Sequence, residues 1–448
     1  MKIVLPVPHF PPRYSAGAEL YTYRLAHRLI REGHQAEVVC VEDTASGAPG
    51  LVATSDSYKG VPVWRLAFDL RAAPDPLRWS YDNPLIREWF DTYLDERRPD
   101  LVHLQSGYLI SDAPLRAAFD RRIATVVTLH DYWFACPRIT LLRGDGSLCA
   151  AVPDDPAACA WCVRLASRRY RLPDKASGGL LGRAMLSLGL ERGRRAMAAR
   201  REHLWGTLAR CDAVIALSRF LAGVFAVGVG VGRLHVLRIG LDSAGMSGPP
   251  PDEAKLRLGY IGQIAPHKGV HLLIDAMQLL SERGRPVELT IYGDLEQHPR
   301  YSATLRRRIG ADRRIRLAGR FARSRLAGVL GQLDALVVPS LWYENSPATI
   351  LEAQAAGRPV LASALGGMME LVRDGVDGLQ FRPGDAHDLA HKIQRLREEP
   401  GLLATLRAGV VAPASFESEL AQLLPIYRSA IVQAVRTPEA PVETSEAS

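Results

Sequence analysis

The feature that most constrains the fold is an alternation of short apolar runs with longer amphipathic segments. The chain opens with the run KIVLPV (residues 2–7), an amphipathic segment at 16–35 and a second run, AEVVCV (36–41). Short apolar runs joined by helical crossovers are typical of parallel strands that are buried on both faces. The sequence therefore predicts a βαβ unit at its start.

The alternation fills the rest of the chain in two blocks. The first block continues with the apolar runs DLVHLQ (100–105), ATVVTL (124–129), DAVIALS (212–218) and RLHVLRI (233–239). The second contains LRLGYIG (256–262), VELTIYG (287–293), IRLAG (315–319), ALVVPS (335–340), RPVLAS (358–363) and GLQF (378–381). Each block predicts an α/β domain with a doubly wound, Rossmann-like sheet. Two such domains facing each other would enclose a deep cleft between the carboxyl ends of their strands.

Local composition indicates the boundaries between these parts. The segment 240–254 is rich in Gly, Ser and Pro, which predicts an interdomain linker. The polar C-terminal end has the composition of a disordered tail. The expected layout is an N-terminal domain over 1–240 with a Cys-rich and basic helical insert at about 136–205, a C-terminal domain over 255–414, a last helix over 415–434 and a disordered tail over 435–448.

The composition of the whole chain excludes several classes. With 448 residues, 47% of them hydrophobic and 23% charged, it is ordinary for a globular protein. The opening MKIVLPVPHFPP is too short and too rich in proline for a secretory signal, and no apolar segment is long enough to span a bilayer. We therefore expect a cytoplasmic protein. The net charge of +8 is not accompanied by a nucleic-acid-reading motif, so no nucleic-acid partner is expected.

The stretch WYENSPATILEA (342–353) is the first candidate for a binding site. Ser346 and Pro347 are typical of an N-cap and a first helical residue after a buried strand. A helix that begins there would point its free N–H groups into the cleft, where they can bind a phosphate. Glu344 precedes this helix and Glu352 lies within it, and carboxylates accept hydrogen bonds from hydroxyls. The pattern fits a nucleotide-sugar, although two solvated surface glutamates would have the same spacing.

Several motifs, in order along the chain, resemble one known family. They are the Glu344-x₇-Glu352 spacing, GYIGQIAPHKGVHLLIDA, LTIYGD, GGMMELVRDGVDGLQFRPGD and, in the first half, the AGAE opening, TLHDYWFACPR and AVIALSRF. This set resembles glycosyltransferase family 4, a group of retaining enzymes with the GT-B fold, and in particular its bacterial cell-surface polysaccharide type. The resemblance covers the chain up to its tail.

The resemblance implies a role for each matching residue. Glu344 would bind hydroxyls of the donor sugar and place its anomeric carbon. Lys268 would neutralise the leaving diphosphate, and Glu352 would bind the nucleotide ribose. His130, at the end of a predicted strand, would donate to the donor sugar or the acceptor; a loop-fixing pair with Asp131 is the alternative.

Further residues would complete the donor site. The backbone of Asn345 and Ser346 would border the diphosphate, and Gly17 would let the first domain approach the phosphates from across the cleft. Phe321 would border the base. Gln263 stands where the family usually has an arginine, so one phosphate cation is missing; Arg320 or Arg323 could replace it.

No cofactor is expected for catalysis. The sequence contains no Asp-x-Asp motif, which is the usual carboxylate handle for a divalent ion on a sugar diphosphate. Cationic side chains and helix dipoles would then stabilise the diphosphate.

Four cysteines fall within one predicted loop: Cys136, Cys149, Cys159 and Cys162. The closing Cys-x₂-Cys spacing lets two thiolates bind one ion, and the other two could complete a tetrahedral structural zinc site. Free thiols are the second interpretation, and disulfides are disfavoured in a reducing cytosol. Cys40 and Cys211 are expected to be buried and unpaired.

The segment 163–201 is strongly basic. It carries eleven Arg or Lys residues and two acids, Asp174 and Glu191, around the apolar stripe of LLGRAMLSLGL (180–190). Such a segment could rest on an anionic membrane surface. A solvated helical segment packed on the first domain would have the same composition.

Together these observations predict a retaining, metal-independent glycosyltransferase of cell-envelope polysaccharide synthesis. It would transfer a sugar from a UDP- or GDP-linked donor to a hydroxyl of a glycan or lipid-linked acceptor. It would be cytoplasmic and could lie peripherally on the inner face of the plasma membrane. A nucleotide-sugar epimerase of the same fold and a non-catalytic membrane scaffold are the alternatives, and Gln263 is the residue that favours the scaffold.

Overall fold

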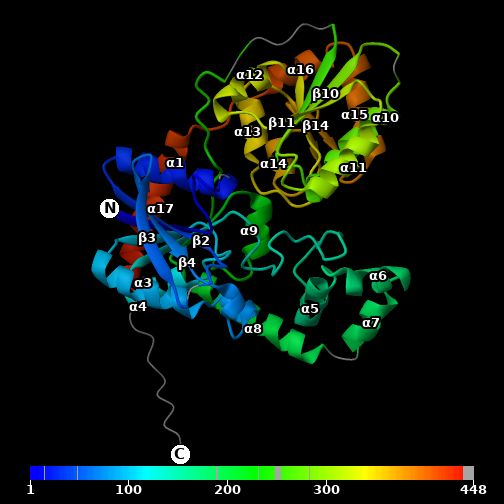
Figure 1. Cartoon of the computed structure of the whole chain (residues 1–448). Helices are drawn as coiled ribbons and strands as arrows, with labels where there is room; N and C mark the ends of the chain where they lie inside the picture. The colour runs from blue at the N-terminus through cyan, green and yellow to red at the C-terminus, as the bar shows by residue number, and fades with distance from the viewer. Residues whose placement is uncertain are drawn as a thin grey trace, which may run out of the picture.

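The chain forms two α/β lobes, which lie one above the other in Figure 1. The computed structural model describes residues 1–436 except Ser15, Ala48, 188–189, Val231, Ser247, 249–253 and Glu282. Six residues of the predicted linker (Ser247 and 249–253) and residues 437–448 of the predicted tail therefore lie outside the described residues.

The first lobe contains an eight-stranded sheet with the strand order β3-β4-β2-β1-β5-β6-β7-β8. Neighbouring strands pair in parallel, apart from the antiparallel pair β3 and β4 at one edge. The strands are β1 (Lys2–Val7), β2 (Gln35–Asp43), β3 (Val52–Tyr58), β4 (Val61–Ala67), β5 (Leu101–Leu104), β6 (Ala124–Leu129), β7 (Ala213–Ala216) and β8 (Leu234–Val236).

The second lobe contains a six-stranded, all-parallel sheet with the order β11-β10-β9-β12-β13-β14. In each sheet the direction in which successive strands are added reverses beside the first strand of the lobe, between β1 and β5 and between β9 and β12. Ligands of doubly wound folds usually bind in the crevice at such a point. The strands are β9 (Leu256–Ile261), β10 (Val287–Tyr292), β11 (Ile315–Gly319), β12 (Ala335–Val338), β13 (Val360–Ser363) and β14 (Gly378–Phe381).

Helices connect and cover the strands. Those before the linker are α1 (Gly17–Arg31), α2 (Pro76–Trp79), α3 (Pro84–Arg97), α4 (Ala113–Asp120), α5 (Pro156–Arg164), α6 (Arg168–Ala176), α7 (Leu180–Ser187), α8 (Glu191–Arg210) and α9 (Arg219–Phe225). Those after it are α10 (Val270–Leu279), α11 (Pro299–Ile309), α12 (Leu326–Gly331), α13 (Ala348–Ala355), α14 (Met368–Leu371), α15 (Ala386–Glu398), α16 (Leu402–Gly409) and α17 (Phe416–Arg436). Three short 3-10 turns are η1 (Leu70–Ala72), η2 (Pro266–Lys268) and η3 (Arg323–Arg325).

The central strands are buried as the continuous apolar runs predict. Every residue of β5, β6 and β7 is buried in the first sheet, as is every residue of β12 and β13 in the second. Burial on both faces explains why these strands show no alternation of apolar and polar residues.

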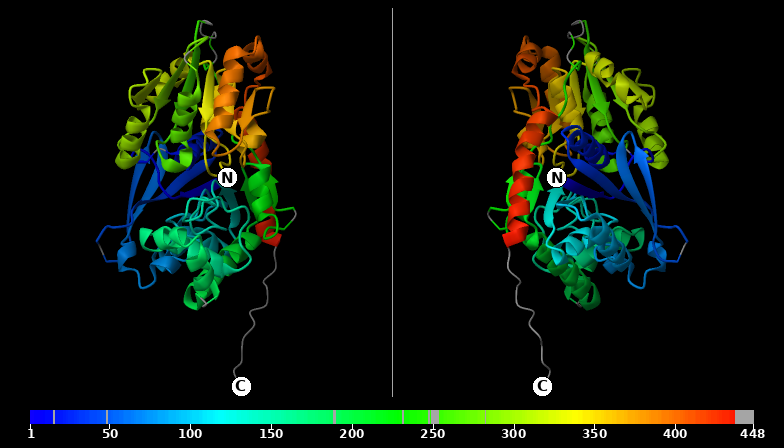
Figure 2. Two further views of the ribbon diagram at one scale, coloured as in Figure 1. Left: turned by 90° about the vertical axis from the view of Figure 1, so that its right-hand side faces the viewer. Right: turned by 90° about the vertical axis from the view of Figure 1, so that its left-hand side faces the viewer.

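The last helix, α17, returns to the first lobe. Figure 2 shows it as the long helix that runs from the second lobe down the side of the first. Phe416, Leu420, Leu423 and Tyr427 are buried in one cluster with residues of β1, β2 and α1. The Tyr427 hydroxyl lies 2.6 Å from Nδ1 of His103 on β5, so the helix is also fixed to the sheet by a buried polar contact.

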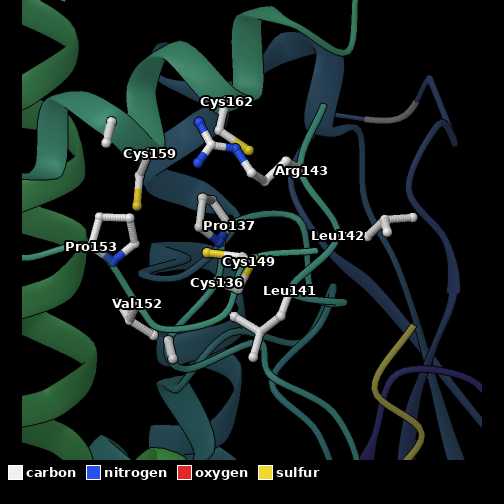
Figure 3. A pocket seen from close by; sticks show the side chains of 12 residues that line it. Cys136, Pro137, Leu141, Leu142, Arg143, Cys149, Val152, Pro153, Cys159 and Cys162 are labelled. Atoms are coloured by element: carbon white, nitrogen blue, oxygen red, sulfur yellow. The ribbon is translucent and has the colours of Figure 1, made fainter. Parts of the chain in front are cut away.

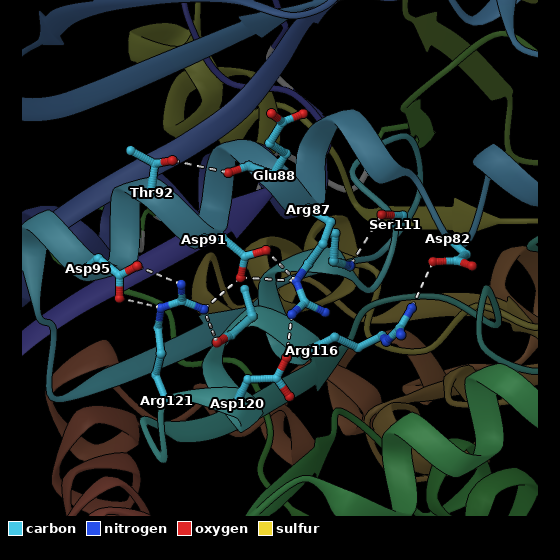
Figure 4. A network of polar contacts seen from close by, with 12 residues as sticks. Asp82, Arg87, Glu88, Asp91, Thr92, Asp95, Ser111, Arg116, Asp120 and Arg121 are labelled. Carbon is cyan, nitrogen blue, oxygen red and sulfur yellow. Dashed lines mark hydrogen bonds and ion pairs between the residues drawn. The ribbon is translucent and has the colours of Figure 1, made fainter.

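Arginines of α3, of α4 and of the C-cap of α4 form ion pairs with neighbouring acids (Figure 4). Arg121 contacts Asp91 at 2.6 Å and Asp95 at 2.7 Å, and Arg116 contacts Asp82 at 2.8 Å. On this part of the surface, the arginines are therefore neutralised by acidic neighbours. Among the described helices, none is both long and apolar enough to cross a membrane.

Candidate functional site

The loop after β12 and the start of α13 form the centre of the candidate site. Helix α13 begins at Ala348, and its N-cap is Pro347, whose ψ of 114° is extended. The prediction that Ser346 is the N-cap is therefore wrong: the extended proline ends the loop, and Ser346 lies one residue outside the helix. The Ser346 hydroxyl is buried and has no hydrogen-bond partner among the described residues. An unsatisfied buried hydroxyl beside the free N–H groups of a helix start is what a bound anion would complete.

Two glycines allow this loop to lie against the next one. The Gly367 amide donates to the Glu344 carbonyl at 2.7 Å, and a Cβ on Gly367 would lie 1.9 Å from the Asn345 carbonyl oxygen. Gly366 has a φ of +56°, which favours glycine. The GG of the GGMMEL motif is thus required by the close approach of the two loops.

Glu344 is held by three donors on one carboxylate oxygen. Its Oε1 accepts from Lys268 Nζ at 2.6 Å, from Ser340 Oγ at 2.8 Å and from Trp342 Nε1 at 2.8 Å. No described residue donates to Oε2, which leaves that oxygen for a ligand hydroxyl. Burial opposes ionisation, but the charge and hydrogen bond of Lys268 and the other two donors outweigh it, so the pKa of Glu344 lies below its ordinary value.

Lys268 reaches Glu344 from a tight turn. It ends η2, and Gly269 follows in the left-handed region with a φ of +70°. A Cβ on Gly269 would lie 1.9 Å from the Pro339 carbonyl oxygen. The HKG turn therefore packs directly on the end of β12, and this packing brings the lysine beside the carboxylate.

Glu352 is buried on α13, and it pairs with Arg323 of η3. Arg323 is about half-exposed. Both residues lie near Arg24 of α1, in the opposite lobe. Arg24 and Arg323 line a pocket of about 360 Å³ between the lobes, together with the linker residues Leu241, Asp242 and Met246. A ribose bound to Glu352 would have to share this carboxylate with Arg323.

Asn345 joins the two lobes through its side chain. Its Oδ1 accepts from the Tyr132 hydroxyl at 2.7 Å, and its Nδ2 donates to the His130 carbonyl at 2.9 Å. The side chain is therefore committed to the first lobe. Only its backbone remains for a ligand, as the resemblance implies.

His130 follows β6 and lies at this junction. Its Nε2 is 3.1 Å from Oε1 of Gln105, and its ring packs edge-on against Tyr21 at 5.0 Å. Burial lowers the pKa of His130 to about 3, so the ring is neutral at physiological pH. Asp131 instead accepts from the Trp133 amide and the Ser106 hydroxyl, and no hydrogen bond joins it to His130. The alternative of a loop-fixing His130–Asp131 pair is therefore wrong.

The other predicted donor-site residues occupy separate places. Gly17 is the exposed first residue of α1, and a Cβ there would meet no atom within 4 Å. Gln263 lies in the loop after β9, and its carbonyl accepts from the Tyr260 hydroxyl at 2.6 Å. Phe321 packs edge-on against Tyr292 at 5.3 Å. Arg320 lies 3.5 Å from Asp294 and Arg323 pairs with Glu352, so both arginines that could replace the missing one already have carboxylate partners.

The four cysteines of the insert surround one small cavity (Figure 3). Cys136 and Cys149 come from the loop after β6, and Cys159 and Cys162 lie on α5. Burial raises the pKa of the Cys149, Cys159 and Cys162 thiols. No three of the four sulfur atoms, all in the described part of the chain, lie within 4.8 Å of one another. Within the described residues, the group whose ligand atoms all lie within 4.8 Å of one another is Asp82, Asp112 and His203.

Sequence reasoning missed two carboxylates that hold distant parts of the chain together. Glu370 of α14 accepts from the backbone amides of Arg219 and Phe220 at the start of α9, at 3.0 and 2.7 Å. Glu419 of α17 accepts from the Tyr21 hydroxyl at 2.7 Å and from the Gly240 amide at 2.6 Å. Glu370 belongs to the GGMMEL motif, but its partners lie about 150 residues earlier in the chain. The spacing of residues in the sequence therefore cannot predict this contact.

Both halves of the chain match models of glycosyltransferase families. Residues 15–244 match "Glycosyltransferase Family 4", and residues 255–399 match "Glycosyl transferases group 1". With two parallel-sheet lobes and a site at the carboxyl ends of their strands, the molecule is a glycosyltransferase with the GT-B fold. Within that class, the chain belongs to glycosyltransferase family 4.

Known proteins agree with this assignment. Glycogen synthase of Mycobacterium tuberculosis is 26% identical over 89% of this chain and 87% of its own length. D-inositol 3-phosphate glycosyltransferase of Kribbella flavida is 34% identical over 40% of this chain and 44% of its own length. The structure of Anabaena HepE in complex with UDP and glucose is similar in fold, with a TM-score of 0.65 and 20% identity over 96% of this chain and all of that one.

Proposed function

We propose that the protein is a retaining glycosyltransferase that uses a nucleoside-diphosphate sugar and glycosylates a hydroxyl of a glycan or lipid-linked acceptor. The observation that carries the proposal is the Glu344–Lys268 pair beside the start of α13. An oriented carboxylate, an ammonium group and free helix N–H groups lie next to one another. These are the groups that a sugar bearing a diphosphate requires.

Each group has a separate task in this proposal. The free Oε2 of Glu344 accepts from sugar hydroxyls and orients the ring. The Lys268 ammonium and the N–H groups of α13 stabilise the negative charge that develops on the leaving diphosphate. Because the His130 ring is neutral, it can donate one hydrogen bond without adding charge. The acceptor hydroxyl attacks from the face that the diphosphate leaves, which retains the configuration of the sugar.

A UDP-sugar is the first donor to test, since HepE has been crystallised with UDP-glucose. The protein is incubated with UDP-, GDP- and ADP-linked sugars and polyprenyl-linked or oligosaccharide acceptors. We expect release of one nucleoside diphosphate and a product with the anomeric configuration of the donor, measured by chromatography and NMR. A product of opposite configuration would contradict the retaining reaction. A changed sugar nucleotide without acceptor would indicate an epimerase, and no binding of any donor would favour a scaffold.

We also propose that helices α6 and α7 contact the membrane surface on which a lipid-linked acceptor would lie. Leu172 and Leu180 are 59% and 60% exposed, and α6 and α7 also carry exposed basic residues, among them Arg168, Arg169 and Arg183. Apolar side chains among cations suit an anionic lipid surface. The protein should therefore sediment with vesicles that contain phosphatidylglycerol but not with pure phosphatidylcholine vesicles. Equal sedimentation with both would contradict an electrostatic contact.

A further inference from the structure

We propose that Cys136, Cys149, Cys159 and Cys162 bind one Zn²⁺ ion, which fixes the loop that carries Tyr132 into the interlobe contact. The inference does not depend on the identity of the sugar donor. It rests on the shared cavity of the four thiols, on the surrounding cations and on the path of the loop.

The cavity has room for a single small occupant. Its volume is about 20 Å³, enough for one water-sized group, and all four cysteines line it. Cys159 and Cys162 lie three residues apart on α5, so both project from the same face of the helix. The remaining two come from the opposite side of the cavity (Figure 3). To bind one ion at the Zn–S distance of about 2.3 Å, the sulfur atoms would have to move inward from their present positions.

Tight packing holds the two sides of the cavity together. A Cβ on Gly144 would lie 2.2 Å from the Cys162 carbonyl oxygen, so the loop that carries Cys149 approaches α5 as closely as glycine permits. The Gly144 backbone also forms a hydrogen bond with the Cys162 thiol. Hydrogen bonds to sulfur are a regular support for metal-bound thiolates.

Two arginines, Arg143 and Arg200, lie beside the cavity. Arg200 is only 4% exposed, and its guanidinium donates to the Trp133 carbonyl. Arg143 lines the cavity, and its Nε is buried with no hydrogen-bond partner. The charge of Asp131 acts on Arg200 and the charge of Arg143 acts on Asp145. Four thiolates around Zn²⁺ would carry a net charge of −2, and the two neighbouring guanidinium groups would help to stabilise it.

The cavity is coupled to the interlobe contact through a short loop. The Cys136 amide donates to the Tyr132 carbonyl at 2.7 Å, and the Tyr132 amide donates to the Ile139 carbonyl at 2.9 Å. The hydroxyl of the same Tyr132 donates to Asn345 in the second lobe. An ion that fixes Cys136 therefore also fixes the residue that contacts the donor-site loop.

The first experiment measures metal in the full chain, purified without added metal or chelator. Elemental analysis should find about one zinc per chain. After the zinc is exchanged for Co²⁺, the visible spectrum should show the bands of tetrahedral cobalt bound to thiolates. Wild-type protein that holds no zinc, takes up no Co²⁺ and exposes four reactive thiols would overturn the proposal. Bound iron with labile sulfide, or two disulfides found by mass spectrometry, would overturn it equally.

The second experiment uses the double variant Cys159→Ser/Cys162→Ser, with Cys40→Ala as the control. Cys40 is a buried cysteine of β2 outside the cavity. The double variant should lose zinc, whereas the control should keep it. In wild-type protein, chelation should increase hydrogen exchange in residues 132–149 more than in β1 or β9, and zinc should reverse the change. Exchange that is the same with and without zinc would overturn the link to Tyr132.

Discussion

At the scale of single residues, the Lys268–Glu344 contact places an ammonium group and a carboxylate side by side where the donor sugar would react. Three donors occupy one oxygen of Glu344 and leave the other free. Sequence spacing identifies Glu344, because it belongs to a strand–loop–helix pattern. It cannot indicate that Lys268, 76 residues earlier, holds the carboxylate directly, because that contact depends on the packing of Gly269 on β12.

The first prediction concerns Lys268→Met. This change removes the cation and leaves the Glu344 carboxylate buried without its strongest partner, so donor turnover should fall by about 10²-fold or more and the pKa of Glu344 should rise. The rate of nucleoside diphosphate release measures the effect. Lys255→Met is the matched control, since Lys255 pairs with Glu288 on the surface and its loss should leave the rate unchanged. Turnover of Lys268→Met at the wild-type rate would exclude the proposed role.

At the scale of elements, helix α17 shows what the sequence can and cannot predict. Its apolar spacing indicates a helix at the end of the chain, and the helix is present. Spacing cannot indicate which surface a terminal helix covers, because that depends on contacts with residues about 400 positions earlier, such as Tyr21. The parallel strands were predictable because their apolar runs are continuous. The start of α13 was not, since Ser-Pro suits both a cap and an extended loop end.

The second prediction concerns Glu419 at the start of α17. Burial raises the pKa of this carboxyl from an ordinary 4.5 to about 7. Between these values the folded chain holds a proton that the unfolded chain has lost. The stabilising contribution of Glu419 is therefore complete below about pH 4.5 and is lost as the pH rises through about 7. It amounts to about 3 kcal/mol in the free energy of unfolding.

Glu419→Gln should reduce this pH dependence, because glutamine keeps an acceptor but does not titrate. Urea unfolding at several pH values between 4.5 and 8 measures the change. The control is Glu417→Gln, which removes an exposed carboxylate on the same helix and should leave the slope as it is in the wild type. A Glu419→Gln slope that equals the wild-type slope would show that another group is responsible.

At the scale of the whole molecule, the two lobes meet through side chains next to the candidate site. Asn345 binds Tyr132 and the His130 backbone, Glu370 binds the start of α9, and Phe220 stacks on Tyr343 with ring centres 4.8 Å apart. Because two of these contacts involve the donor-site loop or its neighbour, the relative position of the lobes and the geometry of the site depend on each other.

The third prediction concerns Tyr132→Phe. Loss of the hydroxyl removes one hydrogen bond between the lobes and leaves Oδ1 of Asn345 without that donor, which should cost about 1 kcal/mol. The radius of gyration in small-angle X-ray scattering should increase slightly, and donor affinity should fall. Tyr58→Phe, a change in edge strand β3, is the control and should change neither value. Unchanged scattering and affinity in Tyr132→Phe would mean that the contact does not hold the lobes together.

The return of α17 to the first sheet has a consequence for how the gene can be divided. A stop codon just after β14 would leave every strand in place but would remove α17. Without Phe416, Leu423 and Tyr427, the apolar residues of β1, β2 and α1 that they cover would be exposed to solvent. A truncation at the C-terminus would therefore cause aggregation of the N-terminal lobe. An isolated N-terminal lobe would stay in solution only if residues 416–436 were fused to it.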